Sequence, residues 1–501
     1  MSTNAIVMRS FRVSKKTLYL ILLHIGGVAV LLSAQSVDAL YILSPIVIAT
    51  LICGWFIATL WKRDGEFPIL DIGVFCVLFT VLYITIPLLN FYFGGLSFGP
   101  LSDGRLQSHN PSAVELGLFF INHIVYLASL ASAYLVFRKP NGKLHQLRLI
   151  PPSPSLVKVL VVGYLIGSLY FFVLNFAFGI GFKSGYGDET HILAGPLWLQ
   201  QINGKLAGIH HIFYSSMLAL LILYKNNWKF RYFIFLIIAW EIISAFIRPG
   251  SRGELILLIL LSILYWHKFH RVNFQFLIIM LTFGFLFFMF FGLYRSFANL
   301  SDMVFFVDSF SIIASASNEF QAMLGTAFDV KLIARDVEVP LILFFNDFMP
   351  LLPPQQLLPF AKLSGADWYL MQINQQGMGV GFMWSVISQS LIGFGLGELA
   401  LRGAILGWIL AFIHKWYQRR YIKFLPSVIY IMLSLGTVLT FRDTTGSIFW
   451  EILWTVIPFT FLLYILGFRS IWTPFNSQNF HQHLPTVTTV RLQQIEARNA
   501  G

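Results

Sequence analysis

The sequence predicts an all-α polytopic membrane protein with about 12 transmembrane helices. Hydrophobic residues make up 57% of the chain and charged residues only 11%, whereas roughly a quarter of an average soluble protein is charged. The apolar residues gather in runs of about 20 that do not alternate with polar residues, which favours helices over a membrane β-barrel. The even spread of these runs and the mean hydropathy of +0.73 predict one membrane domain, residues 1–501.

The apolar runs give the expected spans in order along the chain. Met1–Lys16 is basic and precedes the first run, which predicts a retained signal anchor because many further runs follow. Gly393, Gly395 and Gly397 interrupt the tenth run, so it is expected to be a broken or re-entrant helix. The predicted spans are 17–37, 40–61, 68–93, 112–137, 156–178, 201–224, 230–247, 254–266, 274–297, 383–414, 424–441 and 447–467.

Basic residues occupy alternate loops between these spans, which predicts the orientation. Cytoplasmic loops of membrane proteins are enriched in Lys and Arg, so both termini, including the tail 470–501, are expected in the cytoplasm. The same pattern explains the formal net charge of +12 without nucleic-acid binding, because no soluble basic domain is present to carry it. The basic loops contain Lys62/Arg63, Arg138/Lys139/Lys143/Arg148, Lys225/Lys229/Arg231, Lys268/Arg271 and Lys415/Arg419/Arg420/Lys423.

The outer side carries one long loop, 298–380, of about 80 residues, and loops of that length usually have a function. It contains Ser317–Arg335, which is expected to form an amphipathic helix. Carboxylates and histidines on the outer side are candidates for a general base, and spacing alone selects none of them. They are Asp103, His109, Asp188, Glu189, His191, Asp302, Glu319, Asp329, Asp336, Glu338 and Asp367.

The clearest candidate site is the outer turn Arg248–Glu254. Ser251 and Glu254 have capping-box spacing, so Ser251 is expected to cap the eighth span. The exposed amides of that helix start would then lie beside Arg248 and Arg252, an arrangement suited to a phosphate or pyrophosphate. The alternative interpretation is a glycine-rich corner whose arginines contact lipid phosphates.

Two further arginines are expected on the outer side. Arg295 ends the ninth span and Arg442 ends the eleventh. Arginines at such positions are energetically costly and often functional, although Arg442 has Asp443 beside it and could form a structural ion pair. Arg402, within the tenth span, is a weaker candidate.

The sequence contains no phosphate-binding P-loop, nucleotide-binding fingerprint or metal-ligand spacing. No cofactor and no metal site are therefore expected. Cys53 and Cys76 both lie in apolar runs, which argues against a disulfide framework.

Three features of the chain resemble the bacterial O-antigen polymerases (Wzy type) of the oligosaccharide repeat-unit polymerase family. They are the outer turn Gly250–Gly253, the long outer loop in the C-terminal half, and the stretch from Gly379 to Gly395. In that stretch Gly379, Gly381, Phe382, Ser385, Phe394 and Gly395 are similar to the family's Gly-x-Gly-Phe-Ser…Phe-Gly pattern. The acidic residue often found shortly after the serine is missing, and Gln389 is the nearest polar residue.

The resemblance implies a metal-independent glycosyltransferase with a GT-C-like helical fold and a long periplasmic loop in the bacterial inner membrane. Its substrates would be undecaprenyl-pyrophosphate-linked oligosaccharides, and its partners membrane lipid, a chain-length regulator and a flippase. Arg248, Arg252, Arg295 and Arg442 would be catalytic by holding the departing charge, and Ser251, Gly379 and Gly381 would bind substrate.

Two other functions are compatible with the same features. A flippase or other transporter for the lipid-linked oligosaccharide would also have basic cavities, but it should show two similar halves, which this sequence lacks. An O-antigen ligase, or another membrane glycosyltransferase, would use the same lipid-linked donor, and sequence distinguishes it poorly from a polymerase.

Overall fold

In the computed structural model, the described residues are almost entirely helical and form no β-strand. The predicted spans 230–247 and 274–297 lie almost entirely outside the described residues, as do most of the 298–380 loop and of the 470–501 tail. The structure describes residues 15–65, 67–92, 112–140, 150–177, 197–224, 232, 252–270, 326–331, 333–334, 336–341, 343, 365–372, 384–442 and 447–473.

The observed helices follow the predicted apolar runs closely. Five helical segments among the described residues are long and apolar enough to cross a membrane. These five are α2, α3, α4, α15 and the final helix formed by α17, η5 and α18. The chain is therefore an all-α protein of membrane-spanning type. The helix bounds are α1 (Lys15–Leu32), α2 (Val37–Asp64), α3 (Ile72–Tyr92), α4 (Ala113–Phe137), α5 (Pro154–Ala177), α6 (Leu197–Leu223), α8 (Arg252–His270), α13 (Gly365–Gln372), α14 (Val386–Leu391), α15 (Leu396–Gln418), α16 (Phe424–Arg442), α17 (Ser447–Glu451), η5 (Ile452–Val456), α18 (Ile457–Ile465) and η6 (Arg469–Ile471).

Local capping residues determine where several helices begin and end. The Ser36 side chain accepts a hydrogen bond from the Ala39 amide at the start of α2. Gly65 ends that helix with φ of 81°, a left-handed conformation that glycine adopts without a Cβ penalty. Ser112 and Glu115 form a capping box at the start of α4, which satisfies amides that the first helical turn leaves unpaired.

The predicted interruption of the tenth span is confirmed. α14 ends at Leu391, and α15 begins at Leu396 after Gly395, whose φ is 63°. The Glu398 carboxylate accepts a hydrogen bond from the Phe394 amide at 2.8 Å, which holds the turn against the start of α15. A left-handed residue at this point stops α14 from continuing into α15.

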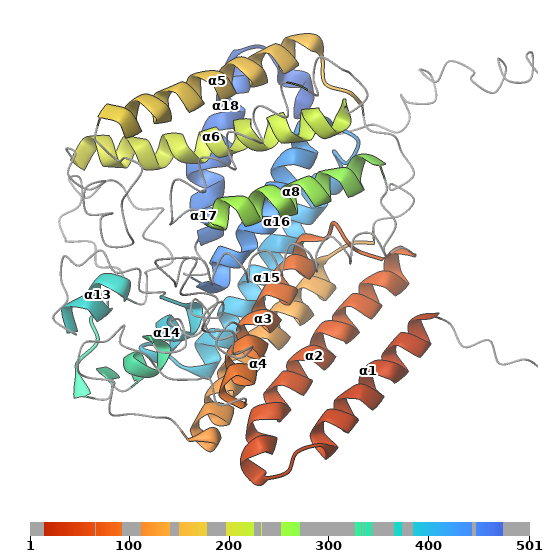
Figure 1. The fold of residues 1–501 in the computed structure, drawn as a ribbon, viewed down its shortest axis with the longest axis vertical. Helices are drawn as coiled ribbons and strands as arrows, with labels where there is room; N and C mark the ends of the chain where they lie inside the picture. Colours follow the sequence, from red (N-terminus) through yellow and green to blue (C-terminus); the bar gives the residue numbers. More distant parts are fainter. Residues whose placement is uncertain are drawn as a thin grey trace, which may run out of the picture.

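The centre of the bundle is the close contact between α4 and α15, which lie side by side (Figure 1). Glycines on α15 allow this approach. A Cβ at Gly403 would lie 2.6 Å from the Tyr126 carbonyl oxygen, and one at Gly407 would lie 2.5 Å from the Leu130 carbonyl oxygen. Small residues at a spacing of four allow helix backbones to pack closely within a membrane.

Where the structure describes the basic loops that the charge pattern assigned to one side, they lie at one end of the bundle. Gln418 donates a hydrogen bond to the Lys139 carbonyl at 3.2 Å, and Lys268 donates one to the Tyr421 carbonyl at 3.0 Å. Arg63 at the end of α2 donates to the Leu135 carbonyl near the end of α4. We call this end the basic end and the opposite one the far end. In Figure 1 the basic ends of α1, α2, α5, α6 and α8 point to the right.

Part of the long loop packs on the far end. Residues 326–331 are helical, within the predicted amphipathic helix Ser317–Arg335, and the Phe328 ring stacks on Phe119 near the start of α4, with centroids 4.5 Å apart. A second hydrophobic cluster joins the loop to α13 and α14, which lie on the left in Figure 1. It consists of Val330, Leu343, Trp368, Tyr369, Trp384 and Ile392.

Candidate functional site

Five of the predicted site residues lie outside the described residues, namely Arg248, Ser251, Arg295, Gly379 and Gly381. Arg252 is the first residue of α8 and Arg442 is the last residue of α16. A helix that begins at Arg252 is what a cap at Ser251 requires. α8 ends and α16 begins at the basic end, so Arg252 and Arg442 both lie at the far end, on the same side as the loop helix 326–331.

Asp329 is a buried carboxyl group in the loop helix. Its side chain accepts a hydrogen bond at Oδ2 from the Tyr369 hydroxyl at 2.6 Å, and the residue is only 3% exposed. Its Oδ1 atom has no hydrogen-bond partner among the described residues. Burial raises the pKa of Asp329 to about 7, although the hydrogen bond from Tyr369 acts in the opposite direction. A carboxyl group with its pKa near neutrality is suited to act as a general base.

The second hydrophobic cluster holds Asp329 and Tyr369 in place. Tyr369 lies on α13, whose first residue, Gly365, sits against the Trp384 indole; a Cβ there would approach the ring to 2.3 Å. Trp384 in turn donates a hydrogen bond from Nε1 to Gln389 at 3.1 Å. The position of the carboxyl therefore depends on packing between three segments that are separate in the sequence.

Ser385 and Gln389 have structural roles in this arrangement. Ser385 is the N-cap of α14 and accepts a hydrogen bond from the Ser388 amide at 3.1 Å. Gln389 is fully buried and donates to the Leu343 carbonyl, which ties α14 to the loop. At the position where the family resemblance leads one to expect an acidic group, the chain thus has a buried amide.

Contacts between four aromatic rings connect the surroundings of Asp329 to Phe441 at the end of α16. Phe328, next to Asp329, stacks on Phe119. Phe119 contacts His123 with centroids 5.2 Å apart, and His123 contacts Phe441 at 5.7 Å. Phe441 directly precedes Arg442. The candidate base Asp329 and the candidate cation Arg442 thus lie in the same part of the far end. They are more than a hundred residues apart in the sequence.

The other described candidates have simpler explanations. Asp336 and Glu338 are exposed, so they do not share the environment of Asp329. Arg402 forms an ion pair with Glu398 one turn earlier, with Nε and Oε1 2.6 Å apart, and so stabilises the start of α15. Cys53 and Cys76 are buried and form no disulfide, as predicted.

The sequence did not predict a buried ionic network at the basic end. Arg138 donates to Asp71 from Nε at 2.9 Å and also pairs with Asp64. Tyr134 donates to Asp71 Oδ1 at 2.7 Å, and His414 Nε2 lies 3.8 Å from Asp71 Oδ2. Burial opposes ionisation of Asp71, but His414, Arg138 and the hydrogen bonds from Tyr134 and Gly73 outweigh it and lower the pKa of the carboxyl.

Arg138→Ala is expected to destabilise the protein by about 3–5 kcal/mol, because it removes the guanidinium that pairs with the buried carboxylates of Asp64 and Asp71. Thermal unfolding of the purified protein in detergent measures this effect, with the exposed neighbour Lys139→Ala as control. Because the pKa of Asp71 is lowered, its contribution is present above a pH of about 4 and is lost as the pH falls through its folded-state pKa. Equal melting temperatures for the Arg138→Ala and Lys139→Ala variants would contradict this role.

Among the described residues, no three His, Cys, Asp or Glu side chains are grouped as a metal site requires. In comparisons with protein families, with characterised proteins and with solved structures, no match to this chain was found.

Proposed function

We propose that this protein is a glycosyltransferase of the bacterial inner membrane that polymerises undecaprenyl-pyrophosphate-linked oligosaccharide repeat units into O-antigen or a related surface polysaccharide. The observation that best supports this proposal is Asp329, a buried carboxyl group with its pKa raised to about 7. It lies at the far end of the bundle, where α8 begins at Arg252 and α16 ends at Arg442. A base and a set of cations are what transfer from a lipid pyrophosphate requires.

In the proposed reaction, a hydroxyl group of the acceptor sugar attacks the anomeric carbon of the growing glycan. Asp329 takes the proton of that hydroxyl as the new glycosidic bond forms. The bond between the anomeric carbon and the pyrophosphate oxygen breaks, and undecaprenyl pyrophosphate leaves with the electron pair. Tyr369 donates a hydrogen bond to Asp329 and so favours its ionised form.

Arginines stabilise the departing pyrophosphate in this proposal. Arg248 and Arg252 flank the start of α8, where helix amides and the helix dipole also favour an anion. Arg295 and Arg442 would complete the cationic surface, and Ser251, Gly379 and Gly381 would contact substrate. Guanidinium groups bind phosphate oxygens in a bidentate manner, which allows charge stabilisation without a divalent ion.

The orientation proposed with this function places the basic end in the cytoplasm and the 298–380 loop in the periplasm. Reporter fusions at Asn141, Asn226 and Gly501 are expected to give a cytoplasmic signal, and one at Asp336 a periplasmic signal. The physical reason is the retention of Lys- and Arg-rich loops on the cytoplasmic side. A periplasmic signal at Asn226 would overturn this orientation.

A clean deletion of the gene, with lipopolysaccharide separated on a gel, tests the proposed function. Loss of the ladder with a single repeat unit still attached to the core is the result expected for a polymerase. Loss of every unit would instead indicate a ligase or a flippase, and an unchanged ladder would exclude all three. In the cell, the polymerase would act after a flippase and together with a chain-length regulator.

A further inference from the structure

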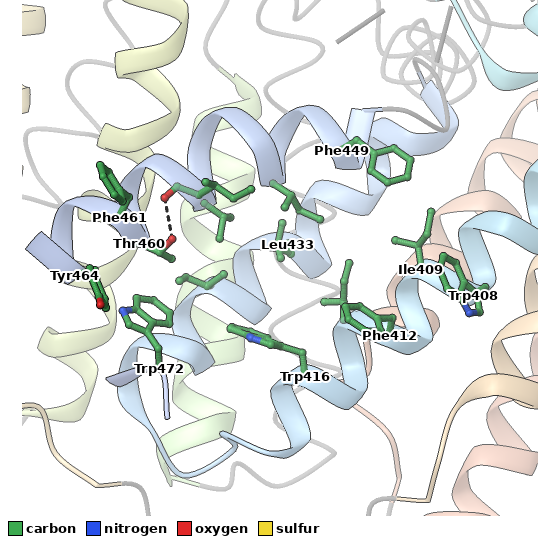
Figure 2. A pocket seen from close by; sticks show the side chains of 15 residues that line it. Trp408, Ile409, Phe412, Trp416, Leu433, Phe449, Thr460, Phe461, Tyr464 and Trp472 are labelled. Atoms are coloured by element: carbon green, nitrogen blue, oxygen red, sulfur yellow. Dashed lines mark hydrogen bonds between the residues drawn. The ribbon is translucent and has the colours of Figure 1, made fainter. Parts of the chain in front are cut away.

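An apolar groove of about 720 Å³ runs between α15, α16 and the final helix (Figure 2). Its walls carry large aromatic side chains, among them Trp408, Phe412, Trp416, Phe461, Tyr464 and Trp472. The hydroxyl group of Thr460, also in the wall, donates to the Ile457 carbonyl of its own helix at 2.8 Å. The walls therefore suit a hydrocarbon chain far better than a polar ligand.

The groove opens sideways, where a membrane-spanning bundle meets lipid. Phe412 and Phe461 are each 63% exposed, and Trp408 is 51% exposed. Along α15 the groove extends from Trp408 to Trp416, about 12 Å at the rise of an α-helix. Along the final helix it extends from Phe449 to Tyr464, about 22 Å. These lengths bracket the roughly 15 Å of hydrocarbon in one leaflet.

Three cations surround the end of the groove that lies at the basic end of the bundle. The Arg420 guanidinium lies 5.3 Å from the centroid of the Trp416 ring and donates from Nε to the Trp472 carbonyl at 2.9 Å. Arg469 lies 4.8 Å from the Tyr464 ring. Lys423 donates from Nζ to the Thr473 carbonyl at 2.8 Å. The same aromatic residues thus line the groove and support its basic rim.

Two of the three cations at this rim have no carboxylate partner within the described part of the chain. Neither Arg420 nor Arg469 forms an ion pair with a carboxylate of a described residue. Burial and the neighbouring Arg419 lower the pKa of Arg420, and burial and Arg420 lower that of Lys423. The Trp472 indole N–H has no acceptor among the described residues. An anionic head group would compensate these charges and accept that hydrogen bond.

We propose that the groove is a binding site for an anionic phospholipid, whose acyl chain lies between α15, α16 and the final helix and whose phosphate contacts Arg420, Lys423 and Arg469. The cationic rim is at the basic end, opposite Asp329, so the head group would bind away from the proposed site of glycosyl transfer. Hydrocarbon walls and a cationic rim together distinguish it from ordinary lipid contact along the bundle, which the chemistry of the head group would not affect.

Native mass spectrometry of the purified, delipidated full-length protein with phosphatidylglycerol or phosphatidylcholine of identical acyl chains tests this site. The wild type is expected to bind phosphatidylglycerol at least 10-fold more tightly than phosphatidylcholine. Each basic residue at the rim is expected to contribute about five-fold to this preference. Arg420→Gln and Arg469→Gln should each reduce that preference about five-fold. Lys62→Gln, an exposed cation at the same end but on α2, should leave it unchanged.

Equal binding of the two lipids by the wild type, or an unchanged preference in the Arg420→Gln/Arg469→Gln double variant, would rule out the site. The position of the chain is tested separately with phosphatidylglycerol brominated in its acyl chains, which quenches nearby tryptophans. Trp408→Phe together with Trp416→Phe should lower the quenched fraction of the fluorescence. Quenching unaffected by these changes would mean that the chain lies elsewhere. Neither measurement depends on glycosyl transfer, so this proposal and the proposed function can fail independently.

Discussion

Asp329→Asn is expected to lower the rate of glycan polymerisation by about 100- to 10,000-fold, the usual contribution of a general base, while the protein reaches the membrane at its normal level. Asparagine has nearly the same shape as aspartate and can still accept the hydrogen bond from Tyr369, so the packing around it should survive. The variant cannot accept a proton from the acceptor hydroxyl. The chain-length distribution of the product is compared between the variant and the wild type, and an immunoblot measures the level of each protein in the membrane.

The pH dependence of the rate separates a base from a structural group. Because the pKa of Asp329 is raised to about 7, the active ionised form appears as the pH rises through that value, and the rate should rise with it. Tyr369→Phe removes a hydrogen bond that favours the ionised form, so it should move the rise to higher pH. Asp336→Asn, at an exposed position of the same loop, is the matched control. Normal polymer from Asp329→Asn would exclude Asp329 as the base.

Arg248→Ala and Arg252→Ala should each slow polymerisation by about 100- to 1000-fold, the cost of removing a donor that stabilises transition-state charge. The two residues are four apart, beside the start of α8, and would act most strongly as the pyrophosphate gains charge. Arg→Lys keeps the charge but loses the planar fork, so partial rescue is expected. Long chains on a lipopolysaccharide gel, at equal membrane levels, report the effect.

Lys62→Ala is the matched control for these two substitutions, because Lys62 is an exposed cation at the basic end. If both arginine variants produced full-length polymer at wild-type levels, the pyrophosphate proposal for this turn would be wrong. The turn would then be a capped corner between two helices, and the cations would have to be sought around Arg295, Arg442 and the long loop.

The helices were largely predictable because each apolar run carries its own signal. The predicted 112–137 and 424–441 agree with α4 and α16 almost to the residue. The break at Gly395 was also predictable, because glycine is the residue that adopts a left-handed conformation at no cost. The described ends of α2, α4, α8 and α15 meet at the basic end, which agrees with the alternation of basic loops because that pattern depends only on the order of spans.

The buried charges were not predictable in the same way, because their environment comes from several helices. The sequence pattern placed Arg138 among the cations of a basic loop. In the structure it pairs with Asp64 and Asp71, which come from another part of the chain. In the sequence, Asp329 is one of many outer carboxylates. It differs from the others because the loop packs on Phe119 and α13 packs on Trp384, and these contacts involve segments that are distant in the sequence. The one local signal was its position between Phe328 and Val330, where apolar neighbours favour burial.

Reconstitution with defined substrate tests the central proposal most directly. The purified protein in nanodiscs would be incubated with a single repeat unit on undecaprenyl pyrophosphate, in the presence of EDTA, and the lipid-linked products analysed by mass spectrometry. Species carrying two or more repeat units, together with released undecaprenyl pyrophosphate, are the predicted result, and the Asp329→Asn protein should form neither. The proposal that this chain is a polymerase would be contradicted if the well-folded wild-type protein left the substrate at one repeat unit, both with and without added divalent metal.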